Sequence, residues 1–430
     1  MREICSNAMD NKWSSEGSDT PLTKIKITTD LETGEITVWN NGYSIPVKKE
    51  EYTFKDYRKN TEITEELYPA EIFFGEMGAG TNFDDTEERK TSGRNGMGAK
   101  AANIFSKKLI IQHSSPEDRK IFDQTYWDNG KKHLEPQVNV YRRKTGFTEV
   151  CFIPDYEYFK YPSSKSFGLD ETFVSVLKMY AYEMAMITNI PIVFNDETLR
   201  VKNLEQYVRL FYPDKKQKSY RFETSTGDEC VVVERSEPEE DVLKEVTHMS
   251  FVNGVRTFNG GIHVDEWVSA IIPPFVSQYN KRKPKKGEVV LKVSGDLVKP
   301  YLTFFIRIEV DKPGFSSQTK DELTEVNEKS NGYKISKTDS WKKELEKAFR
   351  TMMKWEFVAL LEDKIQSKAD QAQRKKEGSS NKRLAMGKKL NDANKAGSNE
   401  SFKCTLYIAE GLSAKAFVTS GLSVIGKDYY

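Results

Sequence analysis

Apolar and polar residues alternate along the chain with two periods, which together predict strands and helices. Alternation at every second position over 22–28 and 35–39, with Gly34 between them, predicts a β-hairpin. Apolar residues at helical spacing predict a helix over 169–188 and a long amphipathic helix over 341–365. Short apolar runs predict further strands at 108–111, 148–154, 191–194, 229–233, 249–253, 260–265, 289–293 and 302–310. A last strand, turn and helix are predicted from 403 onward.

The first residues of the chain predict a helix with one polar face. Its polar side chains recur at i, i+4, i+7 and i+8, which places them on the same side of a helix. They are Glu3, Asn7, Asp10 and Asn11. Such a face is usually solvated surface, and the alternative is that it forms part of a binding site.

A glycine-rich segment precedes a second short helix. Residues 75–98 hold six glycines, and the segment ends in a turn over 91–100 that leads into a helix at 101–105. Glycine allows the backbone to approach a ligand closely, and a helix start offers unpaired N–H groups. The pattern therefore predicts a phosphate-binding turn with Lys100 near a phosphate oxygen, although plain turns also have this composition.

Length and charge restrict the class of protein. A chain of 430 residues with 37% hydrophobic residues predicts two or three globular domains. It has no apolar run long enough to span a membrane and no signal peptide, so we expect an intracellular protein that is not secreted. The four cysteines are too far apart to indicate a disulfide framework or a zinc site.

The net charge is only +1, but positive charge is concentrated in two segments. One is formed by Lys281, Arg282, Lys283, Lys285 and Lys286, and the other spans 374–389. Both could meet phosphates of a nucleic acid, and the alternative is that they are solvated loops. His263 has no acid, cysteine or second histidine at ligand spacing, which predicts a structural role.

Taken in order, the motifs resemble the ATPase half of the type IIA DNA topoisomerases of the eukaryotic and large-virus kind. The matching stretches are 3–11, 40–46, 93–100, 251–253, 260–265, 317–320 and 410–414. The first three alone are equally similar to Hsp90 chaperones, MutL-type repair proteins and histidine kinases, which share the ATPase fold.

The resemblance implies an α/β (α+β) fold with three successive domains. The first is a GHKL (Bergerat) ATPase α/β sandwich over 1–160, and the second is a ribosomal-protein-S5-like transducer domain over 161–370. A basic linker over 371–400 then leads to the start of a TOPRIM domain over 401–430. We also expect that the family's N-terminal arm and its cleavage core are missing from this chain.

The resemblance also implies an ATP site with Mg²⁺. Glu3 would be the general base, Asn7 would coordinate Mg²⁺, and Asn40 would bind the adenine. Lys320 and Gln318 would contact the γ-phosphate, with Lys320 also acting in catalysis. The remaining ATP-binding residues would be Asn11, Thr81, Asn82, Arg94, Asn95, Gly96, Met97, Gly98 and Lys100.

Partners follow from the same resemblance. We expect double-stranded DNA at Lys281 to Lys286, a homodimer through the ATPase domain, and the remainder of the topoisomerase in the same or a separate chain. Glu410 would be a Mg²⁺ ligand of an incomplete TOPRIM site. The location would be the nucleus, the cytoplasm, or a viral factory or virion, with no membrane partner.

Two residues depart from the family pattern. Ser44 replaces a glycine of the adenine-side motif, and Leu412 replaces the Asp of the Glu-Gly-Asp-Ser-Ala signature. Two other functions stay open: a chaperone-type, protein-remodelling ATPase clamp, and a nucleotide-dependent scaffold that does not hydrolyse ATP.

Overall fold

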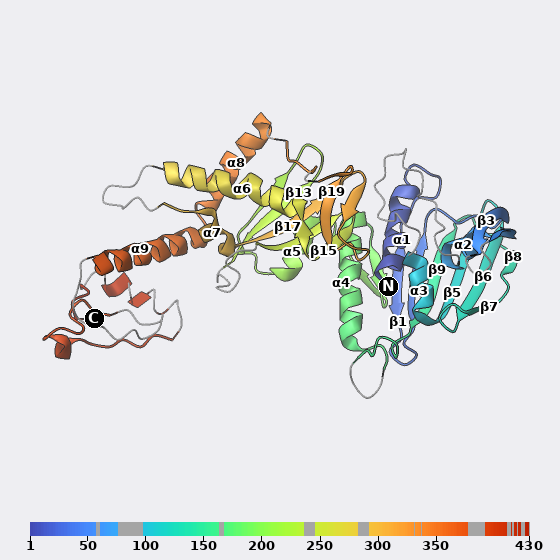
Figure 1. Cartoon of the computed structure of the whole chain (residues 1–430), viewed down its shortest axis with the longest axis horizontal. Coiled ribbons are helices and arrows are strands. Elements are labelled where there is room, and N and C mark those ends of the chain that lie inside the picture. The colour runs from blue at the N-terminus through green and yellow to red at the C-terminus, as the bar shows by residue number, and fades with distance from the viewer. Residues whose placement is uncertain are drawn as a thin grey trace. The chain divides into compact units, whose positions relative to one another are not determined.

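The computed structural model of the chain divides into two compact units, residues 1–361 and 362–430 (Figure 1). The structure describes residues 1–56, 61–75, 98–162, 167–235, 246–282, 292–330, 332–336, 338–376, 392–410, 414, 417–418, 420–422 and 426–429.

A large mixed sheet forms one layer at the start of the first unit. Its strand order is β11-β10-β1-β2-β9-β5-β6-β7, and β8 also pairs with β6. Only β1 and β10 run parallel among these pairs. The strands are β1 Ile25–Thr29, β2 Ile36–Asn41, β5 Ser106–Ser115, β6 Lys120–Trp127, β7 Lys132–His133, β8 Gln137–Val140, β9 Phe147–Pro154, β10 Ile192–Phe194 and β11 Glu197–Leu199.

Helices cover one face of this sheet, which gives the expected α/β sandwich (Figure 1). In β1, Ile25 and Ile27 are buried while Lys26 is exposed, so only one face enters the core. Ile4 and Ala8 pack against that face from the N-terminal helix. The helices of this layer are α1 Arg2–Ser14, α2 Pro69–Gly75, α3 Gly98–Ile104 and α4 Glu171–Thr188. A separate hairpin is formed by β3 Glu50–Asp56 and β4 Thr61–Leu67.

The first sheet continues past residue 160, where the sequence placed the end of the first domain. β10 pairs in parallel with β1, so that Ile192 lies opposite Ile25. A parallel pair requires the chain to cross back before it can pair, and α4 makes that return here. The predicted strand at 191–194, which falls in the range expected for the second domain, therefore belongs to the first sheet.

The rest of the first unit contains two smaller sheets. The five-stranded one has the order β12-β13-β17-β14-β15, and the other has the order β16-β19-β18 with β20 beside β19. Every residue of β13 is buried, because helices pack on both faces of the larger sheet. The strands are β12 Ser219–Glu223, β13 Glu229–Glu234, β14 Thr247–Val252, β15 Val255–Thr257, β16 Gly260–Gly261, β17 Leu302–Ile308, β18 Pro313–Phe315, β19 Glu322–Val326 and β20 Lys329–Ser330.

The predicted strand over 260–265 was largely wrong. Only Gly260 and Gly261 pair as a strand, and α6 begins at Ile262. Gly261 has φ 124°, and a Cβ there would lie 2.1 Å from the Leu323 carbonyl oxygen, so β16 can approach β19 only with glycine. His263 is fully buried in the first turn of α6, as expected for a structural histidine.

The helix predicted over 341–365 is divided in two. Residues 353–355 interrupt it, and the second part runs on to Lys376, into the segment predicted as a linker. Residues 404–409 form no strand among the described part of the second unit, where no neighbouring strand pairs with them. The other helices are α5 Leu204–Phe211, α6 Ile262–Lys281, α7 Gly295–Val298, α8 Asp339–Met352, α9 Glu356–Lys376, and the 3₁₀ turns η1 Lys299–Tyr301 and η2 Ser401–Lys403.

Among the helices of the described residues, none combines the length and the apolar character needed to cross a membrane. Most of the predicted strand at 289–293 lies outside the described residues.

His113 on β5 is fully buried and stacks on Phe122 with ring centroids 4.9 Å apart. Burial disfavours the charged imidazolium and lowers the pKa of His113 to about 4. The unfolded chain therefore binds a proton at His113 as the pH falls below about 6.5, while the folded chain stays neutral there until about 4.

We expect His113 to make the protein less stable as the pH falls from 6.5 to 4, by about 1.4 kcal/mol per pH unit. A His113→Phe variant should show a shallower pH dependence of the free energy of unfolding, measured by urea denaturation. His133→Phe is the matched control, because His133 is exposed on β7. Equal slopes for the parent and His113→Phe would contradict this assignment.

Candidate nucleotide site

The polar face of α1 carries the first residues of the candidate site. Ile4, Cys5 and Ala8 turn toward the sheet and are buried, which leaves Glu3 and Asn7 on the side away from the core. The Glu3 side chain is 30% exposed, and Asn7 is exposed one turn later. Both side chains can therefore be reached by a ligand.

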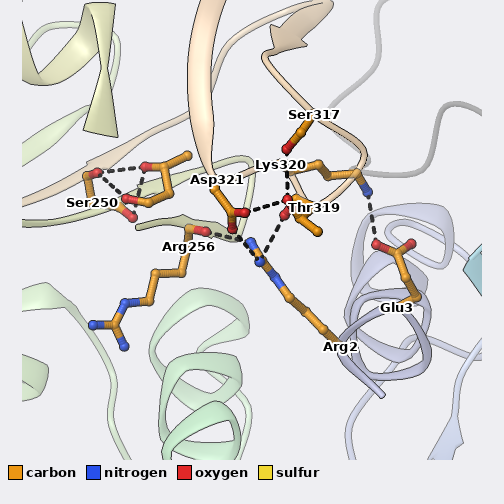
Figure 2. A network of polar contacts seen from close by, with 9 residues as sticks. Arg2, Glu3, Ser250, Arg256, Ser317, Thr319, Lys320 and Asp321 are labelled. Carbon is orange, nitrogen blue, oxygen red and sulfur yellow. Dashed lines mark hydrogen bonds and ion pairs between the residues drawn. The ribbon is translucent and has the colours of Figure 1, made fainter. Parts of the chain in front are cut away.

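A loop from the second half of the first unit brings a cation to Glu3. Lys320, between β18 and β19, places its Nζ 3.4 Å from Glu3 Oε1 (Figure 2). The Lys320 backbone is left-handed, with φ 57°, and its N–H donates to the Ser317 carbonyl at 3.1 Å. This tight turn directs the ammonium group toward α1, so residues 317 positions apart in the sequence form an ion pair.

The start of α3 packs directly against the same glutamate. A Cβ on Gly98 would lie 2.3 Å from Glu3 Oε2, so only glycine leaves room for the carboxylate in this position. Lys100, two residues further on, is 1% exposed. An ammonium group buried to this degree needs polar or charged neighbours, which makes Lys100 part of the interior around α3.

Asn11 has a structural task that its sequence pattern does not indicate. Its side-chain amide donates to the Tyr43 carbonyl at 2.9 Å and accepts from the Tyr43 N–H at 2.8 Å. A Cβ on Gly42 would lie 2.1 Å from Asn11 Oδ1, and Gly42 has φ 111°. Asn11 thus joins α1 to the turn that follows β2.

The adenine-side residues lie at the end of β2. Asn40 is buried, and its side-chain amide donates to the Asn41 carbonyl at 2.9 Å. Ser44 lies beside Gly146, where a Cβ on the glycine would come within 1.8 Å of the Ser44 hydroxyl oxygen. The structure therefore accommodates the serine through a glycine on the neighbouring segment.

The other predicted site residues are Gln318, Glu410 and six residues that the structure does not describe. Gln318 is exposed on the loop that holds Lys320. Thr81, Asn82, Arg94, Asn95, Gly96 and Met97 lie outside the described residues. Glu410 is exposed in the second unit, and the described part of the chain contains no group of three or more acidic, histidine or cysteine residues able to hold a metal.

The predicted DNA segment is described only at its start. Lys281 is exposed at the end of α6, and the guanidinium of Arg282 lies 4.1 Å from the centre of the Tyr279 ring. Lys283, Lys285 and Lys286 lie outside the described residues, as does Leu412.

Arg2, the neighbour of Glu3, is a site residue that was not predicted. Its guanidinium contacts Thr319 and Asp321 on the Lys320 loop, and the carbonyl of Arg256 on β15 (Figure 2). The only signal in the sequence is a positive charge next to a predicted acidic residue, which is too common to indicate a site.

A buried acid supports the far side of this network. Glu183 on α4 accepts from the Arg256 guanidinium at 3.1 Å and from the Tyr207 hydroxyl at 3.0 Å. Burial raises the pKa of Glu183, and the Arg256 charge opposes that rise. The ion pair holds β15 against α4, next to the site.

The chain is similar to known proteins. The family model of DNA gyrase B matches residues 203–380. A probable DNA topoisomerase 2 of Dictyostelium discoideum is 33% identical over 437 residues, covering 100% of this chain and 26% of the relative. The DNA topoisomerase 2 of Invertebrate iridescent virus 6 is 33% identical over 436 residues, covering 98% and 35%.

A solved structure is also similar to this chain over most of its length. The ATPase and transducer domains of DNA topoisomerase II from Balamuthia mandrillaris are 26% identical, with a TM-score of 0.67, covering 87% of this chain and 85% of that one. The chain is a homologue of the type II DNA topoisomerases. Within these enzymes it corresponds to the ATPase and transducer region, and it spans between a quarter and about a third of the length of these two curated relatives.

We expect Asn11→Ala to destabilise the first unit, because it leaves the Tyr43 backbone without its two hydrogen bonds. The loss should be about 1–3 kcal/mol in the free energy of unfolding, measured by urea denaturation. Asn11→Asp keeps the acceptor for the Tyr43 N–H and should recover part of the loss. An Asn11→Ala protein as stable as its parent would show that Asn11 does not hold this turn.

Proposed function

We propose that the chain is the ATP-binding and ATP-hydrolysing gate of a type II DNA topoisomerase. The observation that supports this most directly is the meeting of Glu3 and Lys320, which come from the two domains expected to form the site. In this proposal two chains dimerise when ATP binds and enclose a DNA duplex for strand passage.

Glu3 would act as the general base for hydrolysis. Its carboxylate is partly exposed on α1, and it would accept a proton from the attacking water while holding that water in line with the γ-phosphate. The Lys320 ammonium would stabilise the negative charge that develops on the transferred group. Gly98 leaves the room that the carboxylate needs.

The same two side chains would sense hydrolysis. Lys320 is paired with Glu3 in this structure. A γ-phosphate carries more negative charge than one carboxylate, so we expect it to compete for the ammonium group. Release of phosphate would return Lys320 to Glu3 and move the loop, which connects hydrolysis to the angle between the domains.

The residues on α1 fit a magnesium ion by their chemistry. Mg²⁺ prefers oxygen ligands and keeps several waters, and the exposed Asn7 side chain offers one amide oxygen a turn away from Glu3. When bound, the ion would neutralise charge on the phosphates. Glu410 is proposed as a ligand of a separate metal site that needs further residues.

We expect Glu3→Ala to lower the ATP hydrolysis rate by about 100-fold or more, because general-base catalysis is worth that much. Glu3→Gln should lose as much, since an amide keeps the shape but cannot accept the proton. The measurement is steady-state release of phosphate with and without DNA. Glu16→Ala, an exposed acid just after α1, is the control. Parent-like hydrolysis by Glu3→Ala would remove Glu3 from this role.

The proposed DNA contact is tested by charge neutralisation. Changing Lys281, Arg282 and Lys283 to Gln should reduce the slope of log K against log salt by about 0.9 for each phosphate that the segment no longer neutralises. The matched control changes Arg142, Arg143 and Lys144, which are exposed on the first domain. Binding is measured by fluorescence anisotropy on a duplex between about 50 and 200 mM salt. Equal slopes for the two triple variants would rule out this segment as the contact.

A further inference from the structure

Arg2 connects three separate parts of the first unit. From the first turn of α1, its Nη1 donates to the Thr319 carbonyl at 3.0 Å and lies 3.3 Å from Asp321 Oδ1. Its Nη2 donates to the Arg256 carbonyl. The two contacted loop residues flank Lys320 on both sides, so Arg2 holds the segment whose side chain reaches Glu3 (Figure 2).

The contacts use the particular shape of the guanidinium group. Its donors point outward in a fixed plane, so a single side chain can bind a backbone carbonyl, a carboxylate and a second carbonyl on another segment. A lysine carries the same charge on one small group and cannot hold both segments in this geometry. Charge alone therefore does not explain the arrangement.

Arg256, whose carbonyl accepts from Arg2, is itself held in place by other contacts. The Arg256 side chain binds the buried Glu183, and the guanidinium groups of Arg2 and Arg256 lie 5.6 and 4.6 Å from the centre of the Phe258 ring. Contacts of this kind add to the attachment of β15 and the residues after it. Arg2 thus connects the turn that contains Lys320, whose backbone is left-handed, to a part of the fold that these contacts hold in place.

We propose that Arg2 is a positioning residue that keeps the Lys320 loop at the Glu3 carboxylate. This rests on the proposed hydrolysis of ATP at Glu3 and goes beyond it, because Arg2 itself does not touch the reacting groups. The Arg2 and Asp321 side chains are 23% and 28% exposed, so the ion pair adds little to global stability. Its effect is local, on the place of the loop.

The first test needs no catalysis. Hydrogen exchange is measured at the Ser316 and Lys320 amides, which donate to Glu322 and Ser317 within the loop. In the nucleotide-free protein, Arg2→Ala should raise their exchange about tenfold, and Arg2→Lys should restore less than half of that on a logarithmic scale. Lys12→Ala, on the last turn of the same helix, should change nothing.

The second test separates positioning from binding. In steady-state hydrolysis, Arg2→Ala should lower kcat about tenfold or more while changing KM for ATP less than about threefold, because Lys320 acts mainly as the transition state forms. Asp321→Asn removes the other end of the ion pair without changing α1, and it should act in the same direction. The double variant should then lose less than the sum of the two losses, as for residues in one network.

The outcomes test the positioning role of Arg2 and the proposed ATP hydrolysis separately. Unchanged exchange in both Arg2→Ala and Asp321→Asn would overturn the positioning role, and so would a raised KM with a parent-like kcat. If Arg2→Ala fails to fold, Asp321→Asn decides alone. If the parent does not hydrolyse ATP, the proposed function falls, while the exchange experiment still decides whether Arg2 holds the loop.

Discussion

The ion pair between Glu3 and Lys320 depends on the orientation of α1, which has one face in the core and carries Glu3 on the other. α1 buries Ile4, Cys5 and Ala8 against the sheet, and this packing fixes which side of the helix faces the loop between β18 and β19. Glu3 can meet Lys320 only while that packing holds. The apolar side of α1 therefore sets the direction of its polar side, so that packing in the core places the Glu3 carboxylate at the site.

Near this ion pair, another buried charged side chain is also stabilised by its partners. Glu183 is almost fully buried, yet Arg256 and Tyr207 both bind it. Removing one partner of such a group costs far more than the pair contributes, because the other is left unpaired away from water. These complementary groups therefore fix where β15 of the five-stranded sheet meets α4.

The sequence predicted much of the local structure, including a helix at the start of the chain. Periodicity located the hairpin of β1 and β2 and the helix α4, because each has a face in the core. It failed at 262–265, where a short apolar run forms the first turn of α6. It also did not show that the first sheet continues past residue 160, since the parallel pairing of β10 with β1 leaves no local signal.

The candidate site shows the same division between what motifs indicate and what only the fold provides. Glu3 and Lys320 could be singled out from motifs, but their pairing needs the tertiary fold. Arg2 and the bond between Asn11 and Tyr43 carry no pattern at all, because a single arginine or asparagine is common on any helix. Contacts to backbone carbonyls in particular depend on where a distant segment lies. The residue types of that segment do not indicate its position.

The shared core has a consequence for how the first unit unfolds. Val231, Val233, Phe251 and Phe305 from the five-stranded sheet belong to the same apolar cluster as Ile25 and Ile27 of the first sheet. A contiguous cluster comes apart collectively, so the two sheets should melt in one transition and not one after the other. A fragment that ends near residue 160 would lack about half of the residues of that cluster and would expose the rest to water, and an ATPase domain made this way would lack its own β10.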